Sequence, residues 1–301
     1  MDLSHVCKVF FALGTAVDIG GVFFPSFRKN IMNYGSRRHD PSNQVAAASN
    51  QKVDFNYYLE FVASFQVPHS WFIHYYIFSV MSSIFWAFQI YTQGPVVRFL
   101  AFSAAQKPGT AMTIQQLSIA WLLMAVQGTR RLYESIIFAK PSQAKMWFGL
   151  WIAGLGYYFF ISIAVWIEGI PTLEQPRPFE SLRISWPSIR TTIAIPLFAY
   201  GSIVQHICHK HLASLKKYSL PQHPFFKSTV TPHYACECLI YLAIAIAAAP
   251  DGKFLNGTVL AGLAFVVSNL AVTAESTRKW YAEKFGSKKL AGRWRMIPHI
   301  Y

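Results

Sequence analysis

Charged side chains are scarce in this sequence of 301 residues. Asp, Glu, Lys and Arg make up 13% of it, against about 25% in a typical soluble domain. Hydrophobic residues make up 53% and aromatic residues 16%, with Trp and Tyr placed near the ends of the apolar runs, as at membrane interfaces. So few charges cannot cover the surface of a soluble protein of this size, and we predict a membrane protein.

Other features are missing as well. Four cysteines do not make a disulfide framework, because Cys7 and Cys208 are isolated and Cys236 and Cys238 would point apart on a helix. The sequence has no G-x-G-x-x-G after a strand, no P-loop, no H-E-x-x-H and no C-x-x-C, which excludes a Rossmann cofactor domain and the common phosphate and zinc motifs. The first apolar run lacks a basic n-region and a small-residue cleavage site, which favours a retained span over a signal peptide.

About seven apolar segments are long enough to cross a hydrocarbon layer, which takes roughly 20 residues each. The expected fold class is therefore all-α, a polytopic membrane protein with about seven transmembrane helices in a single domain, residues 1–301. The segments are Val6–Phe27, Ser70–Thr92, Ile114–Ala139, Met146–Ile167, Ile189–His206, Tyr234–Ala249 and Gly257–Ser276.

Basic residues gather in alternate connections between these segments. The loops after the first, third and fifth segments and the tail after the seventh are rich in Lys and Arg, and the other loops are poorer in net positive charge. This alternation predicts a cytosolic C-terminus and an N-terminus on the far side. It also accounts for the net charge of +14 without nucleic acid. Within residues 28–66 we expect one exposed cytosolic loop.

Ionisable side chains inside a span are costly and usually face a partner or a cavity. Late in the third segment, Arg130 and Arg131 share a helix face with Glu134. Two readings remain open, an internal ion pair near the headgroups and an arginine wall that binds an anionic group bidentately.

The start of the sixth segment carries a second polar group. His233 and Glu237 lie one turn apart, and Tyr234 and Tyr241 follow the side of Glu237. A buried glutamate in an apolar helix needs a hydrogen-bond donor. A packing bond between helices would supply one, but the convergence of these side chains favours a ligand site.

Histidines and the basic tail complete the candidates. His206, His209 and His211 would lie at the interface without nearby carboxylates, so we predict no metal site. His74 lies inside the second span, either as a core residue or as a site residue. In the tail, aromatic residues alternate with Lys and Arg. This pattern fits a docked segment that places cations over a phosphate-bearing ligand, with contact to anionic lipid as the alternative.

These stretches together resemble the steroid 5α-reductase family, and within it the polyprenol (polyprenal) reductase branch. The order and spacing of the pieces carry the resemblance more than any single piece. The pieces are Val67-Pro…Phe72…His74…Tyr76-Ile, Gln127-Gly-Thr-Arg-Arg-Leu-Tyr-Glu134, Gln205…Cys208-His209…Leu215-Lys216, Pro232-His-Tyr-Ala…Glu237…Ile240-Tyr241 and Asn269…Trp280-Tyr281…Lys284-Phe285…Pro298…Tyr301.

The resemblance implies an NADPH site that opens to the cytosol in the endoplasmic reticulum membrane, with residues 210–301 as its main part. By residue types, it implies that cations, hydrogen-bonding side chains and one carboxylate hold the cofactor. These are Arg131, Lys216, His233, Tyr234, Glu237, Asn269, Arg278, Tyr281 and Arg293. Relatives have His where this chain has Arg278, and the tyrosine that polarises the carbonyl in steroid-reducing members falls near Gly128, which argues against a steroid-type pocket.

The expected reaction is reduction of the α-isoprene double bond of polyprenal or polyprenol in dolichol synthesis for protein glycosylation. The partners would be a long-chain polyisoprenoid substrate and membrane lipids, with no obligate protein partner. Glu237 and His74 are the predicted catalytic residues, His74 as proton donor with Tyr76 or Tyr133 as alternatives. A reductase of enoyl-CoA or sterol double bonds, a membrane lipid methyltransferase and a transporter or scaffold remain competing interpretations.

Overall fold

The computed structural model describes residues 2–24, 55–104, 111–173, 186, 188–216 and 218–301. Each of the seven expected segments is a helix in these ranges, so the predicted polytopic helical fold is confirmed. The seven helices are α1 (Leu3–Phe23), α4 (Ile73–Tyr91), α6 (Ile114–Ile137), α7 (Phe148–Ile167), α9 (Ile189–Ser214), α11 (Pro232–Ala247) and α12 (Gly257–Phe285). Most of the exposed loop expected within residues 28–66 lies outside the described residues.

Five of the described helices are long and apolar enough to cross a membrane: α1, α4 with the turn before it, α7, α9 and α12. The helix α11 is apolar but has 16 residues. The helix α6 has 24 residues and carries Arg130, Arg131 and Glu134, which lower its hydropathy. These charges are the reason that α6 is less apolar than its neighbours.

Two helices are longer than the sequence predicted. The helix α9 ends at Ser214 rather than His206, and α12 ends at Phe285 rather than Ser276. Hydropathy falls where a helix leaves the hydrocarbon, but the backbone hydrogen bonds of a helix continue into the polar region. As a result His209, Arg278 and Tyr281 lie on helices rather than in loops.

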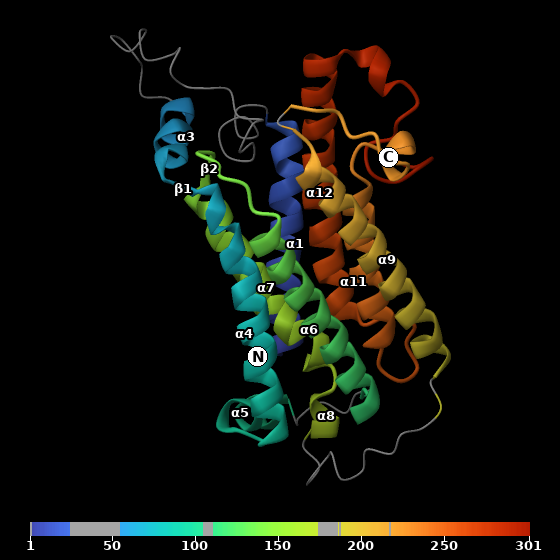
Figure 1. Ribbon diagram of the computed structural model, residues 1–301. Helices are drawn as coiled ribbons and strands as arrows, with labels where there is room; N and C mark the ends of the chain where they lie inside the picture. Colours follow the sequence, from blue (N-terminus) through green and yellow to red (C-terminus); the bar gives the residue numbers. More distant parts are fainter. Residues whose placement is uncertain (1, 25–54, 105–110, 174–185, 187, 217) are drawn as a thin grey trace.

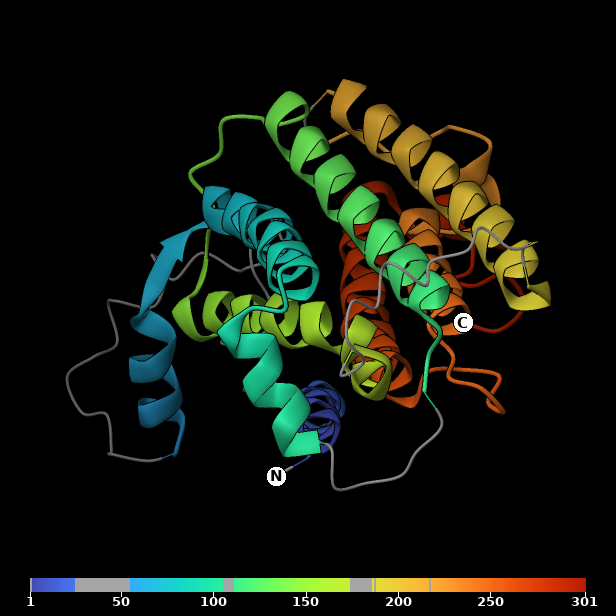
Figure 2. The ribbon, with the colours of Figure 1, turned by 90° about the horizontal axis from the view of Figure 1, so that it is seen from below.

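The helices run alternately up and down through one bundle (Figure 1). The N-terminal end of α1 lies at the same end of the bundle as α5 (Pro95–Ala104) and α8 (Ile170–Leu173), and the C-terminal tail lies at the opposite end. In the view along the bundle, α6 and α9 lie side by side (Figure 2). The remaining close packings join α9 to α11, α1 to α12, and α4 to both α6 and α7.

Short elements decorate the end that carries the tail. The strands β1 (Gln66–Pro68) and β2 (Lys145–Trp147) pair antiparallel with Val67 opposite Met146, and they tie the start of α4 to the start of α7. The sequence did not predict this ribbon. The other short elements are α3 (Phe55–Ser64), η5 (His69–Phe72), α10 (Phe225–Ser228) and η7 (Ser287–Leu290).

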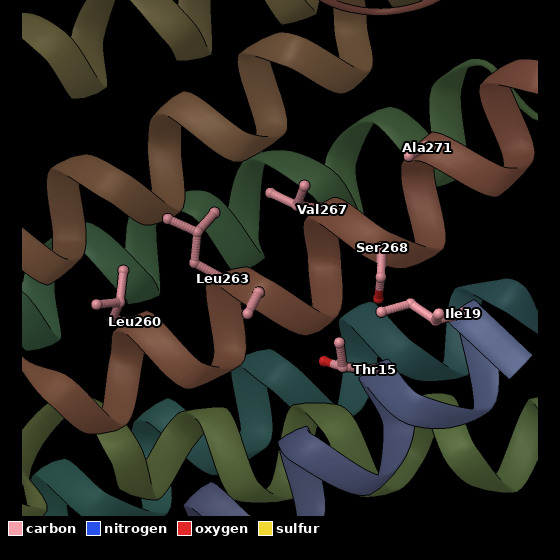
Figure 3. Close-up of a pocket in the computed structure, with 8 residues that line it drawn as sticks. Thr15, Ile19, Leu260, Leu263, Val267, Ser268 and Ala271 are labelled. Carbon is pink, nitrogen blue, oxygen red and sulfur yellow. The ribbon is translucent and has the colours of Figure 1, made fainter. Parts of the chain in front are cut away.

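A buried carboxylate lies in the seam between α1 and α12. Asp18, which is 4% exposed, accepts hydrogen bonds from Ser268 Oγ at 2.9 Å and Asn269 Nδ2 at 3.3 Å. The neighbouring groove of about 510 Å³ is lined mainly by apolar side chains of α1 and α12, and the Ser268 hydroxyl points toward α1 (Figure 3). Asp18 therefore links two helices from opposite ends of the chain.

Replacing Asp18 with alanine is expected to lower the free energy of unfolding by about 1–3 kcal/mol, because the Asn269 amide loses its acceptor in a partly buried position. Asp18→Asn keeps an acceptor oxygen and should lose less. Thermal unfolding in detergent, followed by tryptophan fluorescence, would compare the two variants. Equal midpoints for Asp18→Ala and wild type would show that this contact does not stabilise the seam.

Candidate functional site

A buried carboxylate on α6 is the centre of a polar cluster that joins three helices. Glu134 is 1% exposed and accepts hydrogen bonds from the guanidinium groups of Arg130 and Arg131 on its own helix. Nδ1 of His206 lies 2.8 Å from Oε1 of Glu134, and Nδ1 of His209 lies 2.7 Å from Oε2. Both carboxylate oxygens thus have partners on α6 and on α9.

This arrangement corrects one expectation. The histidines of α9 were predicted to lack a nearby carboxylate, yet two of the three contact Glu134. The sequence could not show this contact, because α6 and α9 are separated in the chain and meet only through tertiary packing. Among the described residues no group of His, Cys, Asp or Glu is arranged to hold a metal ion. The arginines occupy the carboxylate positions that a metal would need.

A chain of side-chain amides connects this cluster to α11. Arg130 donates to Gln127 Oε1 at 2.8 Å and to Gln205 Oε1. The amide nitrogens of both glutamines donate to Oε2 of Glu237, with Gln127 at 3.1 Å. Glu237 therefore receives the donors that its burial requires, and they come from neutral amides rather than from His233.

The whole network balances its charge. Two guanidinium groups, on Arg130 and Arg131, face two carboxylates, on Glu134 and Glu237. A buried group of opposite charges is tolerated in a low-dielectric setting when the charges are paired and hydrogen-bonded to one another. The internal ion pair that the sequence allowed is thus present, and it binds α6, α9 and α11 together. We define the polar network as Gln127, Arg130, Arg131, Glu134, Gln205, His206, His209 and Glu237.

Arg131 extends the network to α4. Its Nη2 donates to the hydroxyl of Tyr76 at 2.7 Å, and its guanidinium lies 4.8 Å from the centroid of the Tyr76 ring. The ring centroids of Tyr76 and Tyr158 are 5.9 Å apart, and those of Tyr158 and Tyr157 are 5.5 Å apart. Tyr157 in turn contacts Tyr241 at 5.9 Å. Tyrosines of α4, α7 and α11 therefore lie beside the charged groups.

Most of these partners carry little signal in the sequence. Gln127 and Gln205 belong to the matched motifs, but a neutral amide in a span gives a weak signal. Tyr157 and Tyr158 lie in the most apolar helix, α7, where tyrosine is indistinguishable from packing residues. Asp18 did carry a usable signal, since a carboxylate inside a predicted span is itself a reason to expect a partner.

The predicted residues His233 and Tyr234 lie where α11 begins. The His233 ring is 5.4 Å from the ring of His209 and 4.4 Å from that of Tyr234. Its Nδ1 is buried and has no hydrogen-bond partner among the described residues. A buried polar atom without a partner is uncommon and marks a place where a ligand could bond.

The basic tail is docked, as its aromatic residues predicted. Val230 N donates to Trp294 O at 2.8 Å, Trp294 N donates to Ser228 O at 2.8 Å, and Thr231 N donates to Arg295 O at 3.1 Å. The hydroxyl of Tyr301 donates to Ala271 O at 3.3 Å. Because Thr231 immediately precedes α11, these bonds hold the tail next to His233.

The cations near the tail differ in their partners. Arg295 is paired with Glu275, and this hydrogen bond raises the pKa of Arg295 above its ordinary value. Arg293 donates to Pro221 O at 3.3 Å. Arg278 has a buried Nε without a partner among the described residues, and Lys216 is exposed. Three cations at this end are therefore free of carboxylate partners among the described residues.

The structure separates the remaining predicted residues. Tyr281 packs against Trp280 and Phe285 near the end of α12. His74 lies in the first turn of α4, with its ring 5.3 Å from Trp71 and 5.9 Å from Trp151. Asn269 lies in the seam with Asp18, a contact that the sequence did not indicate. The groove of Figure 3 lies at this seam and is not lined by the polar network.

Fold and site define a polytopic helical membrane protein with a charge-balanced polar network beside a docked basic tail. Residues 176–301 match the family described as 3-oxo-5-alpha-steroid 4-dehydrogenase, which agrees with the resemblance that the motifs indicated.

Its relatives include proteins named polyprenal reductase. Polyprenal reductase 2 of Oryza sativa subsp. japonica is 25% identical, over 79% of this chain and 80% of its own length. Polyprenal reductase of Saccharomyces cerevisiae is 25% identical, over 80% of this chain and 78% of its own. An uncharacterised protein of Schizosaccharomyces pombe is 28% identical, over 78% of this chain and 79% of its own length. The chain is thus a distant homologue of polyprenal reductases.

Proposed function

We propose that this protein is an NADPH-dependent oxidoreductase that reduces the α-isoprene double bond of polyprenal, or of the corresponding polyprenol, on the way to dolichol for protein glycosylation. The distant homology to polyprenal reductases supports the substrate class. The observation that carries the proposal is local. The buried Nδ1 of His233, one turn before Glu237 on α11, has no hydrogen-bond partner among the described residues, and neither has the buried Nε of Arg278.

The residues at this end fit a dinucleotide phosphate. Phosphate groups need cations and hydrogen-bond donors, and the site offers Lys216, Arg293 and the buried Nε of Arg278. The nicotinamide amide needs a carboxylate or carbonyl acceptor and a donor. Oε1 of Glu237 has no protein partner among the described residues, and Nδ1 of His233 has none either.

We assign the cofactor to these residues together with Tyr234 and Tyr281. Arg131 would act through the polar network, because its Nη1 and Nη2 already donate to Glu134 and Tyr76, and Asn269 would act through the seam with Asp18. When bound, NADPH supplies the hydride that the reaction needs.

The helices allow a lipid substrate to approach from the bilayer. Large apolar side chains at least half exposed face outward on α1, α4, α6 and α9, as a lipid-facing surface requires. Examples are Leu13, Met81, Phe88, Leu122 and Ile203. We place the protein in the endoplasmic reticulum membrane with a cytosolic C-terminus. The contact of Lys140 Nζ with Leu215 O at 2.7 Å supports this orientation, because it joins two basic loops at the end that carries the tail.

The test is reduction by membranes that contain the protein. Given NADPH and polyprenal, they should form the product with one more saturated isoprene unit, seen by mass as a gain of two hydrogen atoms. Membranes without the protein are the control, and an enoyl-CoA and a steroid with a conjugated carbonyl are run in parallel. Unchanged polyprenal would refute the proposal. Reduction of the enoyl-CoA or the steroid alone would instead favour the related reductases, and no reduction of any of the three would favour a transporter or scaffold.

A further inference from the structure

We propose that Tyr76 is the catalytic proton donor of this site, which gives its hydroxyl proton to the carbonyl oxygen of the polyprenal substrate, and that Arg131 holds it ready. This assignment rests on the proposed function. The assignment deepens the proposed function, because the sequence favoured His74 as proton donor and left Tyr76 and Tyr133 as alternatives.

The direction of one hydrogen bond carries the assignment. A guanidinium has only donors, so Arg131 donates to Tyr76 and the Tyr76 oxygen is the acceptor, with an Nη2–O distance of 2.7 Å. The hydroxyl proton of Tyr76 must therefore point elsewhere. No described residue accepts it, which leaves it available to a ligand. When the proton leaves, the charge that remains on the oxygen already faces a cation.

The position of this hydroxyl is held from several sides. Glu134 binds the other terminal nitrogen of Arg131, and the guanidinium also stacks over the Tyr76 ring at 4.8 Å. Tyr158 contacts the ring from α7 at 5.9 Å. A donor that is fixed before the substrate arrives needs little reorganisation during the reaction.

A close approach of α4 and α6 makes this contact possible. Gly128 lies one turn before Arg131 and faces Ser79, which lies one turn after Tyr76. A Cβ at position 128 would be 2.6 Å from the Ser79 hydroxyl oxygen, so a larger residue would have to displace the Ser79 side chain. The glycine thus brings the tyrosine of one helix to the arginine of the other.

The alternative donors are placed less favourably. Tyr133 is 55% exposed and lies outside the polar network. The His74 ring packs against Trp71 in a tilted contact and against Trp151 in an edge contact, in the first turn of α4. Tyr76 is the candidate whose hydroxyl contacts a fixed cation.

The proton balance of the step is complete. The β-carbon of the conjugated aldehyde gains a hydride from NADPH, and the electrons of the double bond move to the carbonyl oxygen. The O–H bond of Tyr76 breaks and an O–H bond forms on the substrate, which leaves a phenolate beside Arg131. Water restores the Tyr76 proton. The enol becomes the saturated aldehyde by gaining a proton on the α-carbon and losing the one on oxygen.

The decisive variant is Tyr76→Phe, which keeps the ring and its stacking but removes the proton. General acid catalysis contributes about 10²–10⁴-fold, so kcat with polyprenal should fall by that factor. NADPH binding, measured by fluorescence quenching on the purified full-length protein, should not change. Tyr75→Phe is the matched control. It removes a neighbouring hydroxyl that donates to Leu150 O at 3.3 Å, and it should keep wild-type kcat.

A second variant separates chemistry from structure. Incorporating 3-fluorotyrosine at position 76 preserves size but makes the phenol more acidic, so the alkaline limb of the kcat–pH profile should move to lower pH. A structural role would leave the profile in place, and this readout also decides the matter if Tyr76→Phe does not fold. The assignment would be overturned if Tyr76→Phe kept the wild-type kcat. It would also be overturned if His74→Gln lost activity while Tyr76→Phe did not. Wild-type protein that leaves polyprenal unchanged would overturn the proposed function itself, and this assignment with it.

Discussion

Replacing Glu134 with glutamine is expected to lower the free energy of unfolding by about 3–5 kcal/mol, the usual effect of removing one partner from a buried ion group. The carboxylate is 1% exposed and is contacted by two guanidinium groups and two imidazole rings. Without it, Arg130 and Arg131 become neighbouring buried cations, and Glu237 is the remaining carboxylate of the network. The side-chain amide of glutamine also adds donors where two guanidinium groups already donate.

The measurement is the thermal unfolding midpoint of the purified protein in detergent, with the yield of folded protein as a second readout. Glu283→Gln, an exposed position on α12, removes the same charge without touching the network and should unfold like wild type. If Glu134→Gln matched Glu283→Gln, the network would not stabilise the bundle, and its value would have to lie in the reaction alone.

The fold was predictable because the bilayer imposes a strong rule on sequence. Every spanning segment must satisfy its own backbone, so long apolar runs become helices, and all seven predicted segments are helical. The predicted C-terminal ends of α9 and α12 were wrong because this rule applies only to the part of a helix that lies in hydrocarbon. Hydropathy reports where hydrocarbon stops, whereas helices continue through Lys- and His-rich surface turns. The β1–β2 ribbon depends on contacts between distant segments, which no local pattern shows.

The site was predictable only in part. A charged residue in a membrane span indicates that a partner exists, but the sequence does not show which residue the partner is. Glu237 was expected to accept from a ligand, with a packing bond between helices as the alternative, and Gln127 and Gln205 from two other helices supply such a packing bond. An ion pair of Glu134 within α6 was one of two interpretations that the sequence left open; the pair is present, and the histidines of α9 contact the same carboxylate. Partners within one helix follow from spacing; partners between helices follow from packing, which only the folded structure shows.

The two carboxylate oxygens of Glu237 have different surroundings. Oε2 accepts from the amides of Gln127 and Gln205, while Oε1 has no protein partner among the described residues. If Oε1 of Glu237 accepts a hydrogen bond from the nicotinamide amide, Glu237→Gln makes NADPH binding unfavourable. The new amide must turn its carbonyl toward the two glutamines, which leaves its NH₂ group facing the NH₂ group of the ligand.

A hydrogen bond to a charged acceptor contributes about 1.5–3 kcal/mol, so Glu237→Gln should weaken NADPH binding by roughly 10- to 150-fold. Titration of purified protein with NADPH, followed by fluorescence, gives the dissociation constant directly and does not depend on the lipid substrate. Glu283→Gln again serves as the charge-matched control and should bind like wild type. Arg293→Ala should weaken binding as well, through the phosphates, because Arg293 is held at the tail by a backbone carbonyl and not by a carboxylate. If both Glu237→Gln and Arg293→Ala bound NADPH as tightly as wild type, the cofactor would lie elsewhere, and the polar network would be a device for holding helices together.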